Sequence, residues 1–224
     1  MSELIVAVVP IRSLRDGKTR LAPILSAEER AAFLRRSAEG VVQAALASWV
    51  IDTILVVSPD PEALAWASGY GPRVRPLPQP EDWPGLNGAI DLAREWALER
   101  DADRLLSLFA DLPLLSKFDI RRLAARRHPV VLGPDRRGEG TNALLLHMQG
   151  PGAGFRFAFG EGSLERHQAE AERLGLRSVV QPTPGIAFDL DTPLDWADYQ
   201  EAAAQTGHDV AWARGRATCG AKRR

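Results

Sequence analysis

Hydrophobic residues gather in short unbroken runs that are separated by longer mixed segments. The runs are rich in Val, Ile and Leu and cover residues 4–9, 53–58, 104–109, 129–133 and 142–147. Because polar residues do not alternate within them, these runs predict central strands that are covered on both faces. Apolar residues recur at helical spacing in segments 26–48, 87–101 and 116–127. The alternation predicts an α/β fold with a mostly parallel central sheet and helices on both faces.

The last third of the pattern predicts a helix at 162–175, a strand at 176–182 and an extended segment in PGIAFDLDTP, residues 184–193. Thr192 and Pro193 then suit the N-cap and the first position of a final helix. With no internal repeat and no linker, residues 1–206 are expected to form one domain. Residues 207–224 lack periodicity and include five basic side chains, so we expect a flexible basic tail there.

The composition of the chain argues against some classes of binding partner. The chain has 224 residues, 45% of them hydrophobic and 25% charged, with a formal net charge of −1. This balance gives no reason to expect a nucleic acid or a membrane surface as partner. The first apolar run is too short for a membrane span and lacks the charged start of a signal peptide. The single cysteine, Cys219, excludes a Cys-based zinc site and fits the reducing cytoplasm, where we expect the protein.

A basic loop follows the first predicted strand, where α/β sheets usually bind ligands. It surrounds Gly17 with four cations, Arg12, Arg15, Lys18 and Arg20. Such a loop could clamp a polyphosphate, although it lacks the GxxxxGK[ST] pattern of a P-loop. A solvated basic loop explains the residues equally well.

Acidic residues follow two later strands. Asp111 comes two residues after the run at 104–109, at the carboxyl end of that predicted strand, and Asp189 and Asp191 lie two residues apart in the extended segment. Two residues apart on a strand, the latter pair would share one face at a separation of about 6–7 Å. Three carboxylates without a neighbouring cation favour a hard divalent metal such as Mg²⁺. In the alternative reading, Asp111 caps a turn, Asp191 caps the next helix and Asp189 faces solvent.

Three glycine-containing turns are candidate small-ligand sites. They are GLN with Asn87 and Gly88, GEGTN with Thr141, and FGEGS with Gly160 and Ser163 at a helix start. Free N–H groups at a helix N-terminus attract phosphate or carboxylate. Each turn is equally consistent with an ordinary structural role. The four histidines accompany no GxSxG elbow, so surface or structural roles are expected for them and a Ser-His-Asp hydrolase is disfavoured.

Taken in order, VPIRSLRDGKTRLAPILSAEER, GLNGAI, ADLPLL, GTNALLL, FGEGSLERH and AFDLDTPLDW resemble the 2-phospho-L-lactate or phosphoenolpyruvate guanylyltransferase family of coenzyme F-420 biosynthesis. The resemblance runs from about residue 5 to 200. It implies the single-domain, Rossmann-like nucleotidyltransferase fold of molybdenum-cofactor guanylyltransferases. The implied reaction joins GMP from GTP to 2-phospho-L-lactate, phosphoenolpyruvate or 3-phosphoglycerate and releases pyrophosphate.

The resemblance also implies roles for individual residues. Asp111, Asp189 and Asp191 correspond to magnesium ligands, and Lys18 and Arg20 to catalytic contacts of the triphosphate. Pro10, Asn87 and Gly88 correspond to the nucleotide site, and Thr141, Gly160 and Ser163 to the site of the three-carbon acid. Arg12 stands where the family more often has lysine, which keeps the charge but not the geometry.

Two other functions stay open. Asp-x-Asp also holds the metal and sugar nucleotide of many glycosyltransferases, although there the motif usually ends a middle strand. A non-catalytic GTP-binding module would bind nucleotide and metal without releasing pyrophosphate. The sequence does not decide which acid is used, or whether the protein is a monomer or a homodimer.

Overall fold

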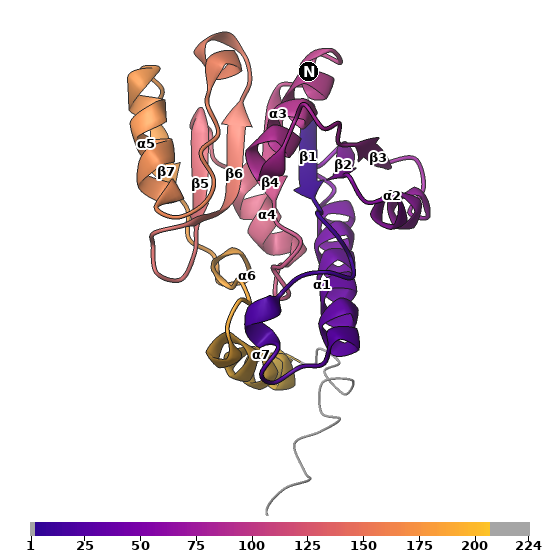
Figure 1. Cartoon of the computed structure of the whole chain (residues 1–224). Coiled ribbons are helices and arrows are strands. Elements are labelled where there is room, and N and C mark those ends of the chain that lie inside the picture. The colour runs from indigo at the N-terminus through magenta and orange to yellow at the C-terminus, as the bar shows by residue number, and fades with distance from the viewer. Residues whose placement is uncertain (1–2, 207–224) are drawn as a thin grey trace, which may run out of the picture.

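A seven-stranded sheet forms the centre of the computed structural model, which describes residues 3–206 (Figure 1). The strand order is β3-β2-β1-β4-β6-β5-β7. The strands are β1 Ile5–Pro10, β2 Thr53–Ser58, β3 Val74–Pro78, β4 Arg104–Leu108, β5 Val130–Pro134, β6 Thr141–His147 and β7 Ser178–Val180. Strand β6 runs antiparallel to β4 and β5, and the other pairings are parallel. The predicted mostly parallel sheet is confirmed, while the basic tail at 207–224 lies outside the described residues.

The connections are mostly helical. The helices are α1 Ala27–Ser48, α2 Pro61–Ser68, α3 Gly85–Leu98, α4 Lys117–Ala124, α5 Ser163–Arg173, α6 Pro184–Ala187 and α7 Pro193–Thr206, with short 3-10 turns at Thr19–Leu21 (η1) and Gly150–Gly154 (η2). At the start of α1, Ser26 accepts a hydrogen bond from Glu29 N–H and the Glu29 carboxylate accepts one from Ser26 N–H. This capping box fixes where the helix begins. No helix among the described residues is long and apolar enough to cross a membrane.

Side chains alternate between the two faces of the sheet. In β1, Ile5, Ala7 and Val9 pack in a cluster with α1, α2 and α4. Val6 and Val8 pack on the other face with α3 and α5. Because successive strand residues point to opposite faces, a strand without polar residues requires helices on both sides. The predicted doubly covered sheet is confirmed.

A third, smaller cluster lies beyond the ends toward which β1 points, where Figure 1 shows η1 and α7. It contains buried residues from η1, α1, α7 and the segment before α7, namely Leu21, Leu25, Phe33, Phe188, Leu190, Trp196, Tyr199 and Ala203. These contacts attach the loop after β1 and the segment 188–191 to the N-terminal half of α1. They place two of the predicted site segments at the same edge of the sheet.

The hydrophobic pattern of the sequence does not predict two of the observed elements, strand β3 and helix α2. Strand β3 carries Pro76 and Pro78 and exposes most of its residues, as an edge strand can because one of its sides needs no ladder hydrogen bonds. Helix α2 has only eight residues, too few for the spacing of its apolar residues to identify it as a helix.

The extended conformation predicted for residues 184–193 is wrong in part. Residues Pro184–Ala187 form a helical turn, and residues 188–191 have no regular structure. A side chain at Gly185 would place its Cβ 2.6 Å from the Leu114 carbonyl oxygen, so the turn depends on close backbone packing. Asp189 and Asp191 therefore do not share the face of a strand.

Candidate active site

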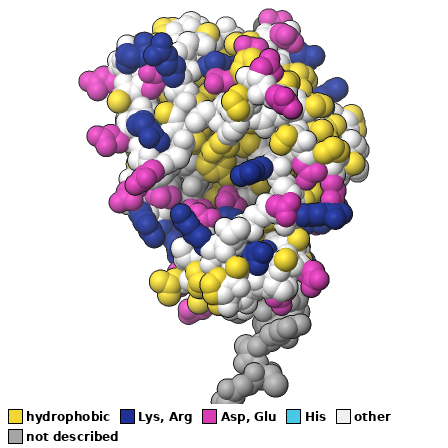
Figure 2. Space-filling model, in the orientation of Figure 1, with side chains coloured by type: hydrophobic (Ala, Val, Ile, Leu, Met, Phe, Trp, Pro, Cys, Tyr) yellow, Lys and Arg dark blue, Asp and Glu magenta, His cyan; other side chains and the backbone are white. Residues whose placement is uncertain are grey.

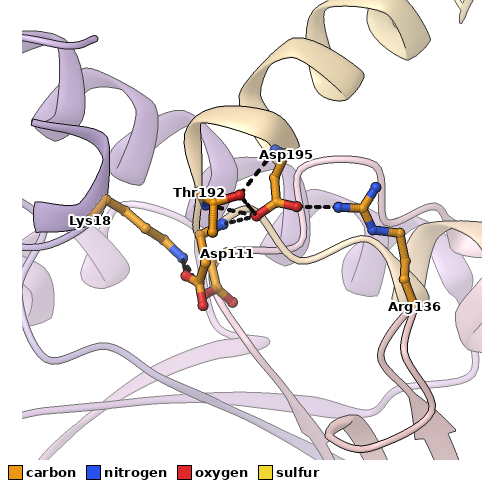
Figure 3. Close-up of polar contacts among 6 residues, drawn as sticks. Lys18, Asp111, Arg136, Thr192 and Asp195 are labelled. Atoms are coloured by element: carbon orange, nitrogen blue, oxygen red, sulfur yellow. Dashed lines mark hydrogen bonds and ion pairs between the residues drawn. The ribbon is translucent and has the colours of Figure 1, made fainter. Parts of the chain in front are cut away.

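Lys18 lies at the centre of the candidate site, between two carboxylates from distant parts of the chain. Its Nζ donates hydrogen bonds to Asp111 Oδ2 at 2.6 Å (Figure 3) and to Asp191 Oδ1 at 2.5 Å. The Lys18 side chain is only 8% exposed, whereas those of Asp111 and Asp191 are 30% and 46% exposed. Solvent and a ligand can thus reach the carboxylates, with the ammonium group buried behind them.

The backbone at Lys18 has an unusual conformation. Its φ of 50° and ψ of 41° lie in the left-handed region, which costs energy for a residue with a side chain. Its carbonyl oxygen accepts a hydrogen bond from Leu21 N–H, and Leu21 is fully buried. The buried turn that follows therefore holds Lys18 in place despite this cost.

The charges of the site favour a cationic lysine. Burial lowers the pKa of Lys18, but the charges and hydrogen bonds of Asp111 and Asp191 outweigh that effect and raise the pKa above its ordinary value. Burial raises the pKa of Asp189, as do the neighbouring charges of Asp111 and Asp191, against hydrogen bonds from its own backbone and from Asn142. All three predicted metal ligands are thus close enough to interact electrostatically.

Side-chain hydrogen bonds hold the backbone that carries Asp191. Asp195 Oδ2 accepts from Asp191 N–H at 3.1 Å, Thr192 N–H at 2.7 Å and the Thr192 hydroxyl at 2.8 Å. Thr192 Oγ1 accepts in turn from Asp195 N–H at 3.3 Å. Thr192 is therefore the N-cap of α7, as expected from the sequence. The Asp191 carboxylate contacts Lys18 instead of capping the helix.

The remaining cations of the basic loop point elsewhere. Arg15 pairs with Glu62 of α2. Arg12 and Arg20 are exposed, and neither forms an ion pair with any residue in the range 3–206. Pro10, at the end of β1, is half-buried. Of the four cations, the fold brings Lys18 to the carboxylates and leaves Arg12 and Arg20 open to solvent.

Two of the residues predicted to bind the acid, Thr141 and Ser163, form a connected, buried group with His167. Ser163 Oγ accepts a hydrogen bond from Thr141 N–H at 2.8 Å, and Thr141 Oγ1 lies 3.0 Å from Nδ1 of His167. His167 Nε2 accepts from Ala158 N–H at 3.0 Å, so its Nδ1 carries the proton and donates to Thr141. Burial, followed by the charge of Arg166, lowers the pKa of His167 to about 4.

Gly160 lies beside this group and requires a conformation that suits glycine. Its φ is 123°, a value that side chains disfavour. The Gly160 carbonyl oxygen accepts a hydrogen bond from Ser163 N–H at 3.1 Å. The fold thus brings Thr141, Gly160 and Ser163 together at the start of α5. The family resemblance implied that these three residues share one site.

Two of the residues predicted for the nucleotide site, Asn87 and Gly88, make internal contacts. Asn87 Oδ1 accepts from Phe159 N–H at 2.8 Å, and Asn87 Nδ2 donates to the Phe159 carbonyl at 3.4 Å. A Cβ at Gly88 would lie 2.6 Å from the Trp83 carbonyl oxygen. Asn87 therefore fastens α3 to the segment before Gly160, and Gly88 allows a close backbone contact.

The carboxylates suit a cation that phosphates help to hold. Carboxylate oxygens are hard ligands, and Mg²⁺ is commonly bound through one or two carboxylates plus substrate phosphates. Within residues 3–206, no group of three or more acidic, His or Cys side chains is arranged to hold a metal ion by itself. Asp111 and Asp191 fit a site in which two carboxylates and the substrate phosphates hold the ion together, with Asp189 nearby.

Other residues support the site without having been singled out as candidates. Asn142 is buried and its Nδ2 donates to the Ile186 carbonyl at 2.9 Å, which holds α6 just before Asp189. Arg136 pairs with Asp195 of α7 (Figure 3) and with Asp198 on the same helix. The spacing of Thr192 and Asp195 is a capping pattern that could have revealed Asp195. No sequence signal marks Arg136.

Figure 2 shows a hollow in the middle of the face that is turned toward the viewer in Figure 1. Hydrophobic side chains lie inside the hollow, and charged side chains of both signs lie around it. A hollow with apolar side chains inside and polar groups around it is the usual form of a small-ligand site.

The chain resembles known proteins in both sequence and fold. It is 40% identical over 192 residues to a phosphoenolpyruvate guanylyltransferase of Sphaerobacter thermophilus, covering 85% of this chain and 89% of the relative. It is 41% identical to one of Rubrobacter xylanophilus, covering 86% and 92%. Among solved structures, a nucleotidyl transferase from Methanothermobacter has a TM-score of 0.62 at 19% identity, covering 91% of this chain and 99% of that one. A 4-diphosphocytidyl-2C-methyl-D-erythritol synthase from Anaerococcus prevotii has a TM-score of 0.62 at 12% identity, covering 92% and 100%. These two structures support the nucleotidyltransferase fold. Residues 5–200 match the family described as "Guanylyl transferase CofC like", and the chain belongs to that family.

Proposed function

We propose that this protein transfers GMP from GTP to a phosphorylated three-carbon acid, with phosphoenolpyruvate as the first candidate, and releases pyrophosphate. The observation that carries the proposal is the Lys18 ammonium held between Asp111 and Asp191, beyond the carboxyl ends of the parallel strands β1 and β4, where α/β sheets usually bind ligands. Family membership and relatives named for phosphoenolpyruvate support this choice of substrates. The product would be an intermediate of coenzyme F-420 biosynthesis.

In the proposed reaction, a phosphate oxygen of the acid attacks the α-phosphorus of GTP. A new P–O bond forms there, the bond to the β-phosphate oxygen breaks, and pyrophosphate leaves with the electron pair. A phosphate monoester is largely ionised at neutral pH because its second pKa is about 6, so no general base is needed. The protein's task is to position the two phosphates and to stabilise the charge at phosphorus.

The chain's residues divide this task. Lys18 supplies a fixed positive charge whose pKa the two aspartates raise, and exposed Arg20 is free to contact the triphosphate. Pro10, Asn87 and Gly88 border the proposed nucleotide side. The buried Thr141–Ser163 contact shapes the turn at Gly160, whose backbone would receive the acid.

Asp111, Asp189 and Asp191 would hold Mg²⁺ in this proposal. When bound, the ion neutralises phosphate charge and orients the triphosphate. The aspartates position the phosphates only if their own backbone is fixed. Asp195 and Asn142 provide that support next to Asp191 and Asp189.

The direct test is pyrophosphate release from GTP and Mg²⁺ with phosphoenolpyruvate, 2-phospho-L-lactate or 3-phosphoglycerate in parallel. We expect turnover with at least one acid, and a loss of about 100-fold or more in Asp111→Asn. Asp101→Asn is the matched control. Asp101 is exposed with a φ of 53°, a conformation that Asn also tolerates, and it precedes β4 at the opposite end of that strand from Asp111.

Three results would contradict the proposal. One is the absence of pyrophosphate with every acid, which would leave a GTP-binding module. Another is an Asp111→Asn rate within threefold of the unaltered protein. The third is turnover of a sugar nucleotide in place of GTP, which would indicate glycosyl transfer.

A further inference from the structure

Asp191 lies in a segment that no strand pairing holds. Residues 188–191 have no regular structure and α6 before them is a single turn. A side chain that must meet a phosphate or a metal within a fraction of an ångström needs support from its surroundings. We propose that Arg136 is a positioning residue for Asp191 and acts through Asp195, an inference that rests on the proposed function for its catalytic consequence.

The first link of this support is Asp195. Its Oδ2 is already used by the N–H groups of Asp191 and Thr192 and by the Thr192 hydroxyl. These bonds fix the backbone on which the Asp191 side chain is mounted. Rotation of the Asp195 carboxylate would loosen all three contacts together, so its orientation decides where Asp191 points.

The second link is Arg136, which engages the other oxygen of the same carboxylate. Its Nη2 pairs with Asp195 Oδ1, and its Nη1 lies 2.8 Å from Asp198 Oδ2 on the next turn of α7. The guanidinium carbon lies 4.5 Å from the centre of the Phe188 ring. Arg136 thus contacts both the start of the unpaired segment and the helix that follows it.

The third link is the loop that carries Arg136, which is itself well held. It joins β5 to β6 through hydrogen bonds from Asp135 N–H to the Gly140 carbonyl, from Gly138 N–H to the Asp135 carbonyl, and from Glu139 N–H to Asp135 Oδ1. Arg136 is therefore mounted on a hydrogen-bonded turn of the central sheet. No strand pairing joins residues 188–191 to the sheet, and the Arg136 side chain connects them to it instead.

The same loop also contacts the proposed acid site. The Glu139 carbonyl accepts from Leu164 N–H at 3.0 Å in the first turn of α5, and Thr141 N–H donates to Ser163. One turn therefore touches both the acid side and, through Arg136, the carboxylate side. This placement sets the distance between the two halves of the site.

An ordinary surface ion pair contributes little, and two features distinguish this one. The Asp195 side chain is only 16% exposed, so it is partly shielded from water. Arg136 also contacts two carboxylates and an aromatic ring at once, because a planar guanidinium presents several N–H donors in a fixed fork and stacks on aromatic faces.

The test compares Arg136→Gln with Arg137→Gln and Arg136→Lys in the full chain. Arg137 is the matched control because it is exposed on the same loop and has no ion pair or hydrogen bond within residues 3–206. The first measurement is amide hydrogen exchange at Asp191 and Thr192, which needs neither substrate nor turnover. We expect about tenfold faster exchange in Arg136→Gln and less than twofold change in Arg137→Gln.

The second measurement is the kinetics of pyrophosphate release. We expect kcat to fall about tenfold to 100-fold in Arg136→Gln and the Mg²⁺ concentration for half-maximal rate to rise, with KM for the acid changing less than threefold. Arg136→Lys should recover part of kcat because one charge still reaches Asp195. These effects should appear with an unaltered far-ultraviolet circular dichroism spectrum.

Unchanged exchange at Asp191 and Thr192 in Arg136→Gln would overturn the inference, as would equal kcat losses in the Arg136 and Arg137 variants. Failure of the proposed function would look different. The unaltered protein would then release no pyrophosphate, while the exchange rates would still report whether Arg136 holds the segment.

Discussion

His167 should make the stability of this fold depend on pH between about 6.5 and 4. The ring is fully buried, accepts a hydrogen bond from Ala158 N–H and contacts Thr141. It packs against the rings of Phe155 and Phe159. Protonation would remove the acceptor for Ala158 and place a charge in this surrounding. Burial, aided by Arg166 and opposed by Glu170, accordingly lowers the pKa of His167 from 6.5 to about 4.

The size of the effect follows from this pKa. In the unfolded chain His167 binds a proton near pH 6.5, whereas in the folded chain it stays neutral until about pH 4. Between these values the unfolded state holds more protons, so stability is fully present above pH 6.5 and declines as pH falls. At about 1.4 kcal/mol per pKa unit, the loss by pH 4 amounts to about 3 kcal/mol.

The assay is urea unfolding of the unaltered protein and of His167→Gln at pH 7, 6, 5 and 4. Glutamine retains a donor and an acceptor but does not titrate, and all other groups are shared by the two proteins. We expect the difference in unfolding free energy between them to change by about 3 kcal/mol from pH 7 to pH 4, to the disadvantage of the unaltered protein at low pH. A difference that is independent of pH, or an NMR titration midpoint of His167 near 6.5, would refute the reasoning.

Two further outcomes test the other internal contacts. Lys18→Met removes the buried cation between Asp111 and Asp191, so pyrophosphate release should fall about 100-fold or more while the circular dichroism spectrum stays unaltered. A loss of less than threefold would speak against its role. Asn87→Ala leaves the N–H and carbonyl of Phe159 without their partners, which should cost about 2 kcal/mol and lower Tm by about 4–8 °C. An unchanged Tm would show that this contact does not support the fold.

Local sequence patterns determined the elements of the fold and several of their boundaries. A strand such as β1, apolar on both faces, cannot be stable without helices on each side, and the structure has them. Ser26 and Thr192 mark the starts of α1 and α7 because capping depends on residues within one helical turn. The grouping of Thr141, Gly160 and Ser163 was implied by the family resemblance, because each glycine turn taken alone was equally consistent with a structural role.

Only the tertiary structure decided how the site is assembled. The Lys18 ammonium meets Asp111 and Asp191 because the buried cluster around Leu21 and Leu190 joins η1 to α7 and the segment before it. The helical turn at Pro184–Ala187 depends on packing of Gly185 against the Leu114 carbonyl, far away in the sequence. Hydrophobic periodicity reports which residues are buried but not which distant segment covers them, and side-chain contacts such as that of Arg136 with Asp195 are set only when those segments pack together.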